Sequence, residues 1–121
     1  MDFTKFCDDV MSLDSNIRFS MILNKNGEKV TGDHRKDITP LLNEDEQKME
    51  LFHAGQRWAS RQNLIHRIGK AKYSITEYEK VKRITFPVDD KHLLLVSTEV
   101  TSDHQKTINS ILNLITKINP E

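Results

Sequence analysis

The apolar residues in the first quarter of the chain predict one helix followed by two strands. Near residues 2–13 they recur at the spacing of a single helical face. From residue 17 to residue 24 apolar and polar residues largely alternate, which is typical of a strand with one buried face. The dipeptide Asn26-Gly27 favours a tight turn, because both residues accept positive φ at little cost. A return strand over residues 28–32 is therefore expected.

The centre of the chain is predicted to hold the longest helix, from about residue 43 to residue 65, after a polar loop over residues 33–39. Asn43 and Glu46 have the spacing of a capping box. The first turn is acidic and the later turns are basic, so the charges at both ends complement the helix dipole. Gly55 costs this helix about 1 kcal/mol relative to alanine. Either another element approaches the backbone closely there, or the chain simply tolerates the glycine.

The second half of the chain is dominated by strand-like segments. Three of them follow Gly69, at residues 72–77, 81–86 and 92–98. The last two are expected to form a hairpin through Asp89-Asp90, which are turn-forming residues. Residues 93–96 are apolar on both faces, which indicates a central strand covered by helices on each side.

A final helix is predicted from an apolar stripe at i, i+3, i+4 and i+7 spacing. The stripe consists of Ile108, Ile111, Leu112, Ile115 and Ile118. Ser102 or Asp103 supplies the N-cap, and Asn119-Pro120 ends the helix.

The order of these elements predicts an α/β (α+β) fold, α-β-β-α-β-β-β-α, as one domain over residues 1–121. The five strands are expected to form one mostly antiparallel sheet. The two terminal helices should cover one face of it and the long middle helix the other, which gives the central strand its two apolar faces.

Composition narrows the class of protein. Eighteen basic and eighteen acidic residues balance, whereas a nucleic-acid-binding domain is usually strongly basic, so nucleic acid is an unlikely partner. No apolar run approaches the roughly 20 residues of a membrane span, and the first residues do not resemble a signal peptide. A cytoplasmic protein is expected, because the only cysteine, Cys7, cannot form an internal disulfide. Cys7 lies in an apolar pattern and is interpreted as a buried small hydrophobe.

No catalytic motif is present, so the sequence predicts neither an enzyme nor a cofactor site. The four glycines do not have the spacing of a phosphate-binding loop. The five histidines have no recognised metal spacing, and a second cysteine for a structural zinc site is missing. Glu44-Asp45-Glu46 is better explained as a helix N-terminus than as a metal cluster.

The most distinctive feature is the segment from residue 51 to residue 76, which contains five Lys or Arg residues and no Asp or Glu. One interpretation is a packed tryptophan beside a solvated arginine row on the middle helix. The other is a recognition surface whose arginines are free to grip carboxylates or phosphates. Partner or anion binding is predicted for this segment and the strand that follows it. The candidate residues are His53, Arg57, Trp58, Arg61, His66, Arg67, Tyr73 and Tyr78.

The order of elements resembles that of the roadblock/LC7 domains and their profilin-like relatives. The likeness is carried by the hairpin from Ile17 to Thr31, and again by Val81 to Thr98 with the last helix. The whole chain is also similar to a family of small archaeal proteins with no assigned activity. The stretches that carry this second likeness are Gln56-Arg57-Trp58, Arg61-Gln62-Asn63-Leu64, His66-Arg67-Ile68-Gly69, Tyr73-Ser74, Thr76 to Ile84 and Asp89 to Leu94.

The roadblock resemblance implies a homodimer that serves as an interaction or regulatory platform, often together with small GTPases or a signalling complex. This is the first functional hypothesis, a non-catalytic module with an unidentified protein partner. The alternative is a small-ligand sensor in which Arg57, Arg61, Tyr73 and Arg83 line an anion pocket. Fold likeness alone does not decide between them, because function depends on the site.

Overall fold

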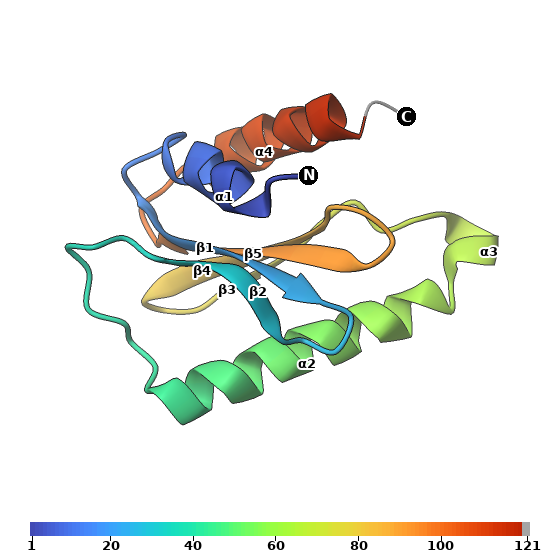
Figure 1. Cartoon of the computed structure of the whole chain (residues 1–121), viewed down its shortest axis with the longest axis horizontal. Coiled ribbons are helices and arrows are strands. Elements are labelled where there is room, and N and C mark those ends of the chain that lie inside the picture. Colours follow the sequence, from blue (N-terminus) through green and yellow to red (C-terminus); the bar gives the residue numbers. More distant parts are fainter. Residues whose placement is uncertain (120–121) are drawn as a thin grey trace.

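Five strands form one antiparallel sheet in the order β2-β1-β5-β4-β3, in a computed structural model that describes residues 1–119 (Figure 1). Their alternating residues point to opposite faces, so each face can bury its own set of apolar side chains. The strands are β1 (Ile17–Asn24), β2 (Lys29–His34), β3 (Ser74–Glu77), β4 (Val81–Pro87) and β5 (His92–Glu99).

Helices cover both faces of the sheet, as the sequence predicted. Helices α1 (Phe3–Met11) and α4 (His104–Ile118) lie side by side on one face (Figure 1). Helix α2 (Glu44–Gln62) crosses the other face and leads into the short helix α3 (Ile65–Ile68), which extends beyond the sheet (Figure 1). Along the part of the chain that is described, no helix is long and apolar enough to cross a membrane.

The central strand β5 supplies both halves of the core, which confirms its predicted bifacial character. Leu94 and Val96 pack in the cluster beneath α1 and α4, whereas Leu93 and Leu95 pack in the cluster beneath α2. All four side chains are 5% exposed or less. Because β5 lies between β1 and β4 in the sheet, it has no edge exposed to solvent.

Helix α2 is fixed to the hairpin turn between β1 and β2 by two glycines. A Cβ atom on Gly55 would lie only 2.9 Å from the backbone nitrogen of Gly27. Gly27 has a φ of +79°, as the predicted turn requires, and a Cβ there would lie 2.5 Å from the carbonyl oxygen of Leu51. Of the two explanations for a glycine at position 55, the structure therefore supports close approach of another element, the β1–β2 turn.

The boundaries of several elements differ from the predicted ones. The capping box of Asn43 and Glu46 forms as expected, but α2 ends at Gln62 rather than residue 65, after which one turn separates it from α3. Gly69 ends the helical region with a φ of +84°. Strand β2 continues to His34, because His34 pairs with Phe19 of β1 across the sheet and their rings are 4.8 Å apart.

The last helix has Asp103 as its N-cap, since the Asp103 side chain accepts a hydrogen bond from the backbone nitrogen of Lys106. The alternative cap, Ser102, is buried and donates instead to the Thr98 hydroxyl. Asn119 forms the C-cap of α4, and Pro120, the other residue of the predicted stop, lies outside the described residues.

Candidate functional site

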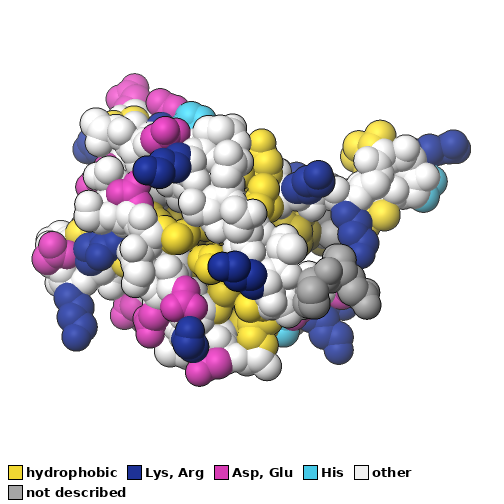
Figure 2. Space-filling view, turned by 90° about the horizontal axis from the view of Figure 1, so that it is seen from above, with side chains coloured by type: hydrophobic (Ala, Val, Ile, Leu, Met, Phe, Trp, Pro, Cys, Tyr) yellow, Lys and Arg dark blue, Asp and Glu magenta, His cyan; other side chains and the backbone are white. Residues whose placement is uncertain are grey.

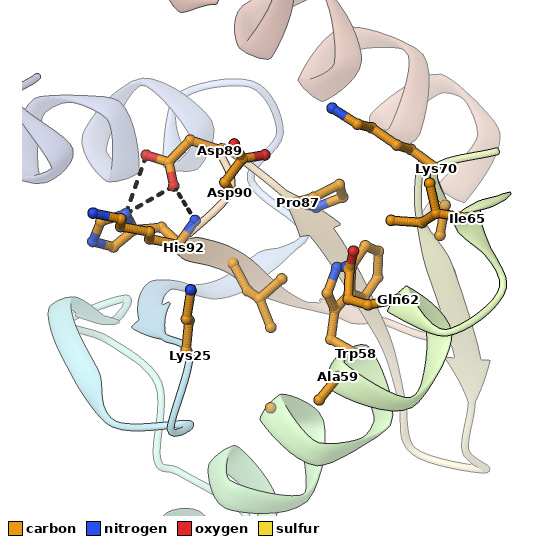
Figure 3. Close-up of a pocket in the computed structure, with 14 residues that line it drawn as sticks. Lys25, Trp58, Ala59, Gln62, Ile65, Lys70, Pro87, Asp89, Asp90 and His92 are labelled. Atoms are coloured by element: carbon orange, nitrogen blue, oxygen red, sulfur yellow. Dashed lines mark hydrogen bonds and ion pairs between the residues drawn. The ribbon is translucent and has the colours of Figure 1, made fainter.

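The acid-free segment of the sequence folds into one wall of a cavity. The second half of α2, the helix α3 and the return toward β3 enclose a space of about 450 Å³ against the hairpin that joins β4 and β5 (Figure 3). Ligand cavities in proteins commonly have about 300–1,000 Å³. We call this space the α2–α3 cavity. The segment supplies Gly55, Trp58, Ala59, Gln62, Ile65, Lys70 and Ala71 to its lining.

The bottom of the α2–α3 cavity is apolar. Trp58 is only 6% exposed and packs with Leu93, which is 5% exposed. The guanidinium carbon of Arg61 lies 5.3 Å from the centre of the Trp58 ring, within the range of a cation–π interaction. Trp58 is therefore mainly a core residue, as the first interpretation of this segment proposed, although one edge of its ring borders the cavity (Figure 3).

The rim of the α2–α3 cavity carries charges of both signs. Asp89 accepts a hydrogen bond from the backbone nitrogen of Lys91 at 2.7 Å and lies 2.9 Å from Nδ1 of His92 (Figure 3). Desolvation by itself would raise the pKa of Asp89, but these hydrogen bonds outweigh it and lower the pKa below the ordinary value. Lys25 and Lys70 lie on other sides of the opening (Figure 3). A ligand here would meet a mixed rim and an apolar interior.

His53, Arg57 and Arg61 form a row along α2, and both of its arginines already have hydrogen-bond partners. Arg57 donates to Glu50 at 2.9 Å, and Glu50 lies just before the acid-free segment begins. Arg61 donates to the hydroxyl of Ser74 at 3.2 Å, at the start of β3. His53 is exposed and forms a T-shaped contact with Phe52. Both arginines that the recognition-surface interpretation left free thus have intramolecular partners, and partner or anion binding by them stays a prediction.

The most exposed part of the segment is the α3 arm, which comprises residues 64–69. None of the residues in α3 is buried, and Ile68 is 79% and Leu64 50% exposed. His66 and Arg67 are also exposed on it. Figure 2 shows the arm projecting from the body of the molecule with apolar, basic and histidine side chains on its surface. Two exposed aliphatic side chains beside two basic groups are suited to contact with another protein.

The two predicted tyrosines lie in different surroundings. Tyr73 lies 6.4 Å from Phe86, which belongs to the core beneath α1 and α4, so Tyr73 is on the opposite face from α2. Tyr78 lines a second cavity, on the same face as α2 but toward its N-terminal half. The predicted anion pocket therefore does not form as one site. Of its four members, Arg83 is in the second cavity with Tyr78, Arg61 contacts Ser74, and Tyr73 lies on the other face.

The second cavity is the site that sequence reasoning found only in part. It has a volume of about 490 Å³ and lies between the sheet, the first half of α2 and the loop that precedes α2. Arg83 had been named from its charge, but Arg18 and His34 had not been linked to it, because their strands come together only in the folded sheet. The available signal was an arginine at the phase of Val81 and Thr85, a phase of β4 with no other charged residue. We call this space the Arg83 cavity.

The groups that could perform catalysis are few among the described residues. Cys7 is 3% exposed, and burial raises the pKa of its thiol, so a reactive thiolate is disfavoured. Within residues 1–119 no group of three or more His, Cys, Asp or Glu side chains is arranged to hold a metal ion. The one amine beside an imidazole in the contacts of the described residues is Lys82, whose Nζ lies 2.9 Å from Nδ1 of His104; Lys82 is buried and also donates to the carbonyl oxygen of Ser102.

Comparison with known proteins gives one family and several similar folds. The model of a family of unknown function, DUF6659, matches residues 2–119. Among solved structures, a Roadblock/LC7 domain from Streptomyces avermitilis is similar at a TM-score of 0.75 and 11% identity, covering 99% of this chain and 97% of that one. The gliding protein MglB from Thermus thermophilus is similar at a TM-score of 0.73 and 9% identity, covering 94% and 85%.

MglB from Myxococcus xanthus is similar at a TM-score of 0.71 and 20% identity, covering 99% of this chain and 98% of that one. No curated protein matches the chain. At these identities the likeness shows the fold, which is that of the Roadblock/LC7 structures: a five-stranded antiparallel sheet between helices.

Proposed function

The chain belongs to the DUF6659 family of unknown function, and we propose that it is a non-catalytic module that binds a second copy of itself and a protein partner. The fold and the described surfaces support binding of proteins better than they support catalysis. The observation that carries the proposal is the hydrogen bond from Arg61 of α2 to Ser74, because it brings the helix next to the start of β3, the strand at the end of the sheet.

Strand β3 is at the end of the sheet, so its outer edge has no neighbouring strand among the described residues. An edge strand presents unpaired N–H and C=O groups, to which another strand can add. The hydrogen bond from Arg61 to Ser74 joins α2 to the start of β3. The row of His53, Arg57 and Arg61 therefore runs toward this edge, and a second copy could contact both at once.

The α3 arm supports the second part of the proposal, the protein partner. Ile68 and Leu64 are large apolar side chains that the fold leaves exposed, and Arg67 and His66 lie between them. The buried cores of interfaces are more apolar than the rest of the protein surface, and arginine is enriched in them. A partner with an acidic and apolar surface would fit the arm.

The structural neighbours point in the same direction. One MglB structure with this fold, at a TM-score of 0.68 and 8% identity, has a tetrameric arrangement. Self-association is thus compatible with the fold. We propose, as the roadblock resemblance implies, a regulatory role in a signalling complex that includes a small GTPase. An archaeal source and a cytoplasmic location belong to the same proposal, and the single cysteine agrees with a reducing compartment.

The test is the mass of the protein in solution by size-exclusion chromatography with light scattering at micromolar concentration. We expect twice the mass of the chain for the unmodified protein and a shift toward the monomer for the double variant Arg57→Glu, Arg61→Glu. The matched control is Lys106→Glu, Lys117→Glu, which reverses two charges on α4, on the other face of the sheet. The proposed surface would be contradicted if the unmodified protein has the mass of a monomer, or if both double variants shift the mass equally.

Trp58 is not a suitable probe of that surface. It is buried in the core, so Trp58→Ala would report lost packing, which costs about 3–5 kcal/mol for a large aromatic residue. The protein partner is better sought by affinity capture with the wild-type chain and with the variant Leu64→Glu, Ile68→Glu on the α3 arm. A partner that both baits capture equally would not use the arm.

A second candidate function is a sensor of small anions. It is favoured by one specific observation, the unpaired guanidinium nitrogen of Arg83 at a cavity, rather than by the four-residue pocket expected from the sequence.

A further inference from the structure

Arg83 is a half-buried charged side chain with one guanidinium nitrogen that the fold leaves without a hydrogen-bond partner. Its Nη1 atom is inaccessible to solvent and has no hydrogen-bond partner within residues 1–119. Burial lowers the pKa of the guanidinium, and nearby Glu50 offsets only part of this effect. A buried donor normally has a partner, because leaving it without one forfeits the hydrogen bonds it made to water. The missing partner is the first sign of a ligand.

The sheet determines where this guanidinium points. Arg83 lies opposite Ser97 of β5 and Thr76 of β3, and its guanidinium carbon lies 5.3 Å from the centre of the Phe19 ring. Phe19 belongs to the core beneath α2 and is 1% exposed. The side chain of Arg83 is thus held on the α2 face of the sheet, where it lines the Arg83 cavity.

The other arginines near this cavity already have anionic or carbonyl partners. Arg18 donates twice to the carboxylate of Glu99, at 3.0 and 3.2 Å, and once to the carbonyl oxygen of Thr39 at 3.1 Å. Arg57 donates to Glu50 at 2.9 Å. Lys80 and Glu79 also line the cavity, but they are exposed and opposite in charge. Arg83 is therefore the half-buried cation that an additional anion would meet, whereas Lys80 is exposed to solvent.

The rest of the lining is mostly apolar. Phe19, Leu41, Leu42 and Val81 form walls around the space of about 490 Å³, and the hydroxyl groups of Tyr78 and Ser97 add two polar positions. Leu41 is 53% exposed although it borders a cavity, so a bound apolar group would cover it. Such a site, with apolar walls and a few charged groups that include Arg83 and Glu50, is typical of small-molecule pockets.

We propose that the Arg83 cavity binds a small organic carboxylate, whose carboxylate pairs with Arg83 while its apolar body packs against Phe19, Leu41 and Leu42. Arginine can hold a carboxylate through two parallel N–H···O hydrogen bonds, and Nη1 would gain its partner once the guanidinium turns so that this atom faces the cavity. A single negative charge is favoured over a phosphate, because Glu50 also lines the cavity and repels a second charge. This inference rests on the second candidate function, the anion sensor, and names its site.

The test is calorimetric titration with defined probes: phenylacetate and octanoate as carboxylates, phenylacetamide as the neutral analogue, and phenyl phosphate as the doubly charged one. We expect saturable binding of at least one carboxylate, with weaker binding of the phosphate and none of the amide. Arg83→Gln should weaken carboxylate binding at least tenfold, and Glu50→Gln should strengthen it. Arg67→Gln, which removes the same charge from the exposed α3 arm, is the matched control and should bind like the wild type.

Three results would overturn the proposal: no binding of either carboxylate at millimolar concentration, equal binding of the amide, or equal binding by Arg83→Gln and the wild type. Arg83→Gln should unfold at a temperature no lower than the wild type, since it removes an unsatisfied charge. If it unfolds earlier, Arg83→Lys, which keeps the charge without the fork of donors, takes its place and should bind several-fold more weakly. If a carboxylate binds but changes neither the mass of the protein in solution nor the capture of a protein partner, the binding site is supported. The sensor function is then contradicted.

Discussion

The contact between Gly55 and Gly27 shows how a single missing side chain positions a long helix. A methyl group at residue 55 would lie 2.9 Å from the nitrogen and 3.0 Å from the Cα atom of Gly27, closer than carbon atoms normally approach. Helix propensity alone favours alanine here by about 1 kcal/mol. Overpacking against a fixed backbone costs about 1–3 kcal/mol, so the two effects oppose each other.

We expect Gly55→Ala to lower the free energy of unfolding by up to about 2 kcal/mol, because the β1–β2 turn cannot move away without losing its own hydrogen bonds and overpacking therefore outweighs the gain in helix propensity. Urea unfolding followed by circular dichroism measures this. Ser60→Ala, on the exposed side of the same helix, is the control and should be neutral or slightly stabilising. A Gly55→Ala protein as stable as the wild type would mean that the contact is not tight in solution.

His34 makes the stability of the protein depend on pH. Its side chain is 17% exposed and its ring lies 4.8 Å from that of Phe19. Burial lowers the pKa of His34 below the ordinary value of 6.5, and the hydrogen bond with Asp33 offsets part of that shift. The unfolded chain therefore binds a proton at a higher pH than the folded one. The stability that neutral His34 contributes is present above pH 6.5 and is lost as the pH falls toward the lowered pKa.

We expect the wild type to lose more stability than His34→Gln between about pH 7.5 and 5.5, measured as free energies from urea titrations at each pH. His66→Gln, on the exposed α3 arm, should keep the pH dependence of the wild type. Identical pH dependence in the wild type and His34→Gln would show that the His34 ring is equally solvated in both states.

At the scale of elements, local signals in the sequence were sufficient for most of the fold. The capping box at Asn43, the turn at Asn26-Gly27 and the bifacial strand at residues 93–96 each depend on neighbours in the chain, and all three form. The ends of elements were less accurate. The helix predicted to residue 65 ends at Gln62, and the extension of β2 to His34 depends on pairing with a distant strand.

The candidate sites were harder to predict because they join elements that are far apart in sequence. The acid-free segment was correctly identified as unusual, but the partner of Arg57 is Glu50, one residue before the segment starts. Tyr73 was grouped with the arginines of a possible anion pocket, although the phase of β3 and β4 places it near Phe86 on the face opposite α2. The Arg83 cavity is lined by residues from four strands, one helix and the loops between them, so no local pattern describes it.

At the scale of the molecule, the two faces of the sheet are covered unequally. Two helices cover one face, where partly buried side chains of α1 and α4 surround the core cluster. A single helix covers the other face, and both the α2–α3 cavity and the Arg83 cavity open there. One helix about 10 Å across cannot seal a five-stranded sheet, whose strands are about 4.8 Å apart. The α2 side is therefore where a second copy can bury the most additional surface.

This asymmetry gives a thermodynamic prediction. Association of folded chains stabilises them by mass action, so the melting temperature of a self-associating protein rises with its concentration. For a chain of this length we expect an increase of about 2–4 °C for each tenfold increase in concentration, measured by scanning calorimetry. The variant Arg57→Glu, Arg61→Glu should lose this dependence, whereas Lys106→Glu, Lys117→Glu on α4 should keep it. If the melting temperature of the wild type does not change with concentration, the α2 surface does not bind a second copy of the chain. It then binds a different partner or none.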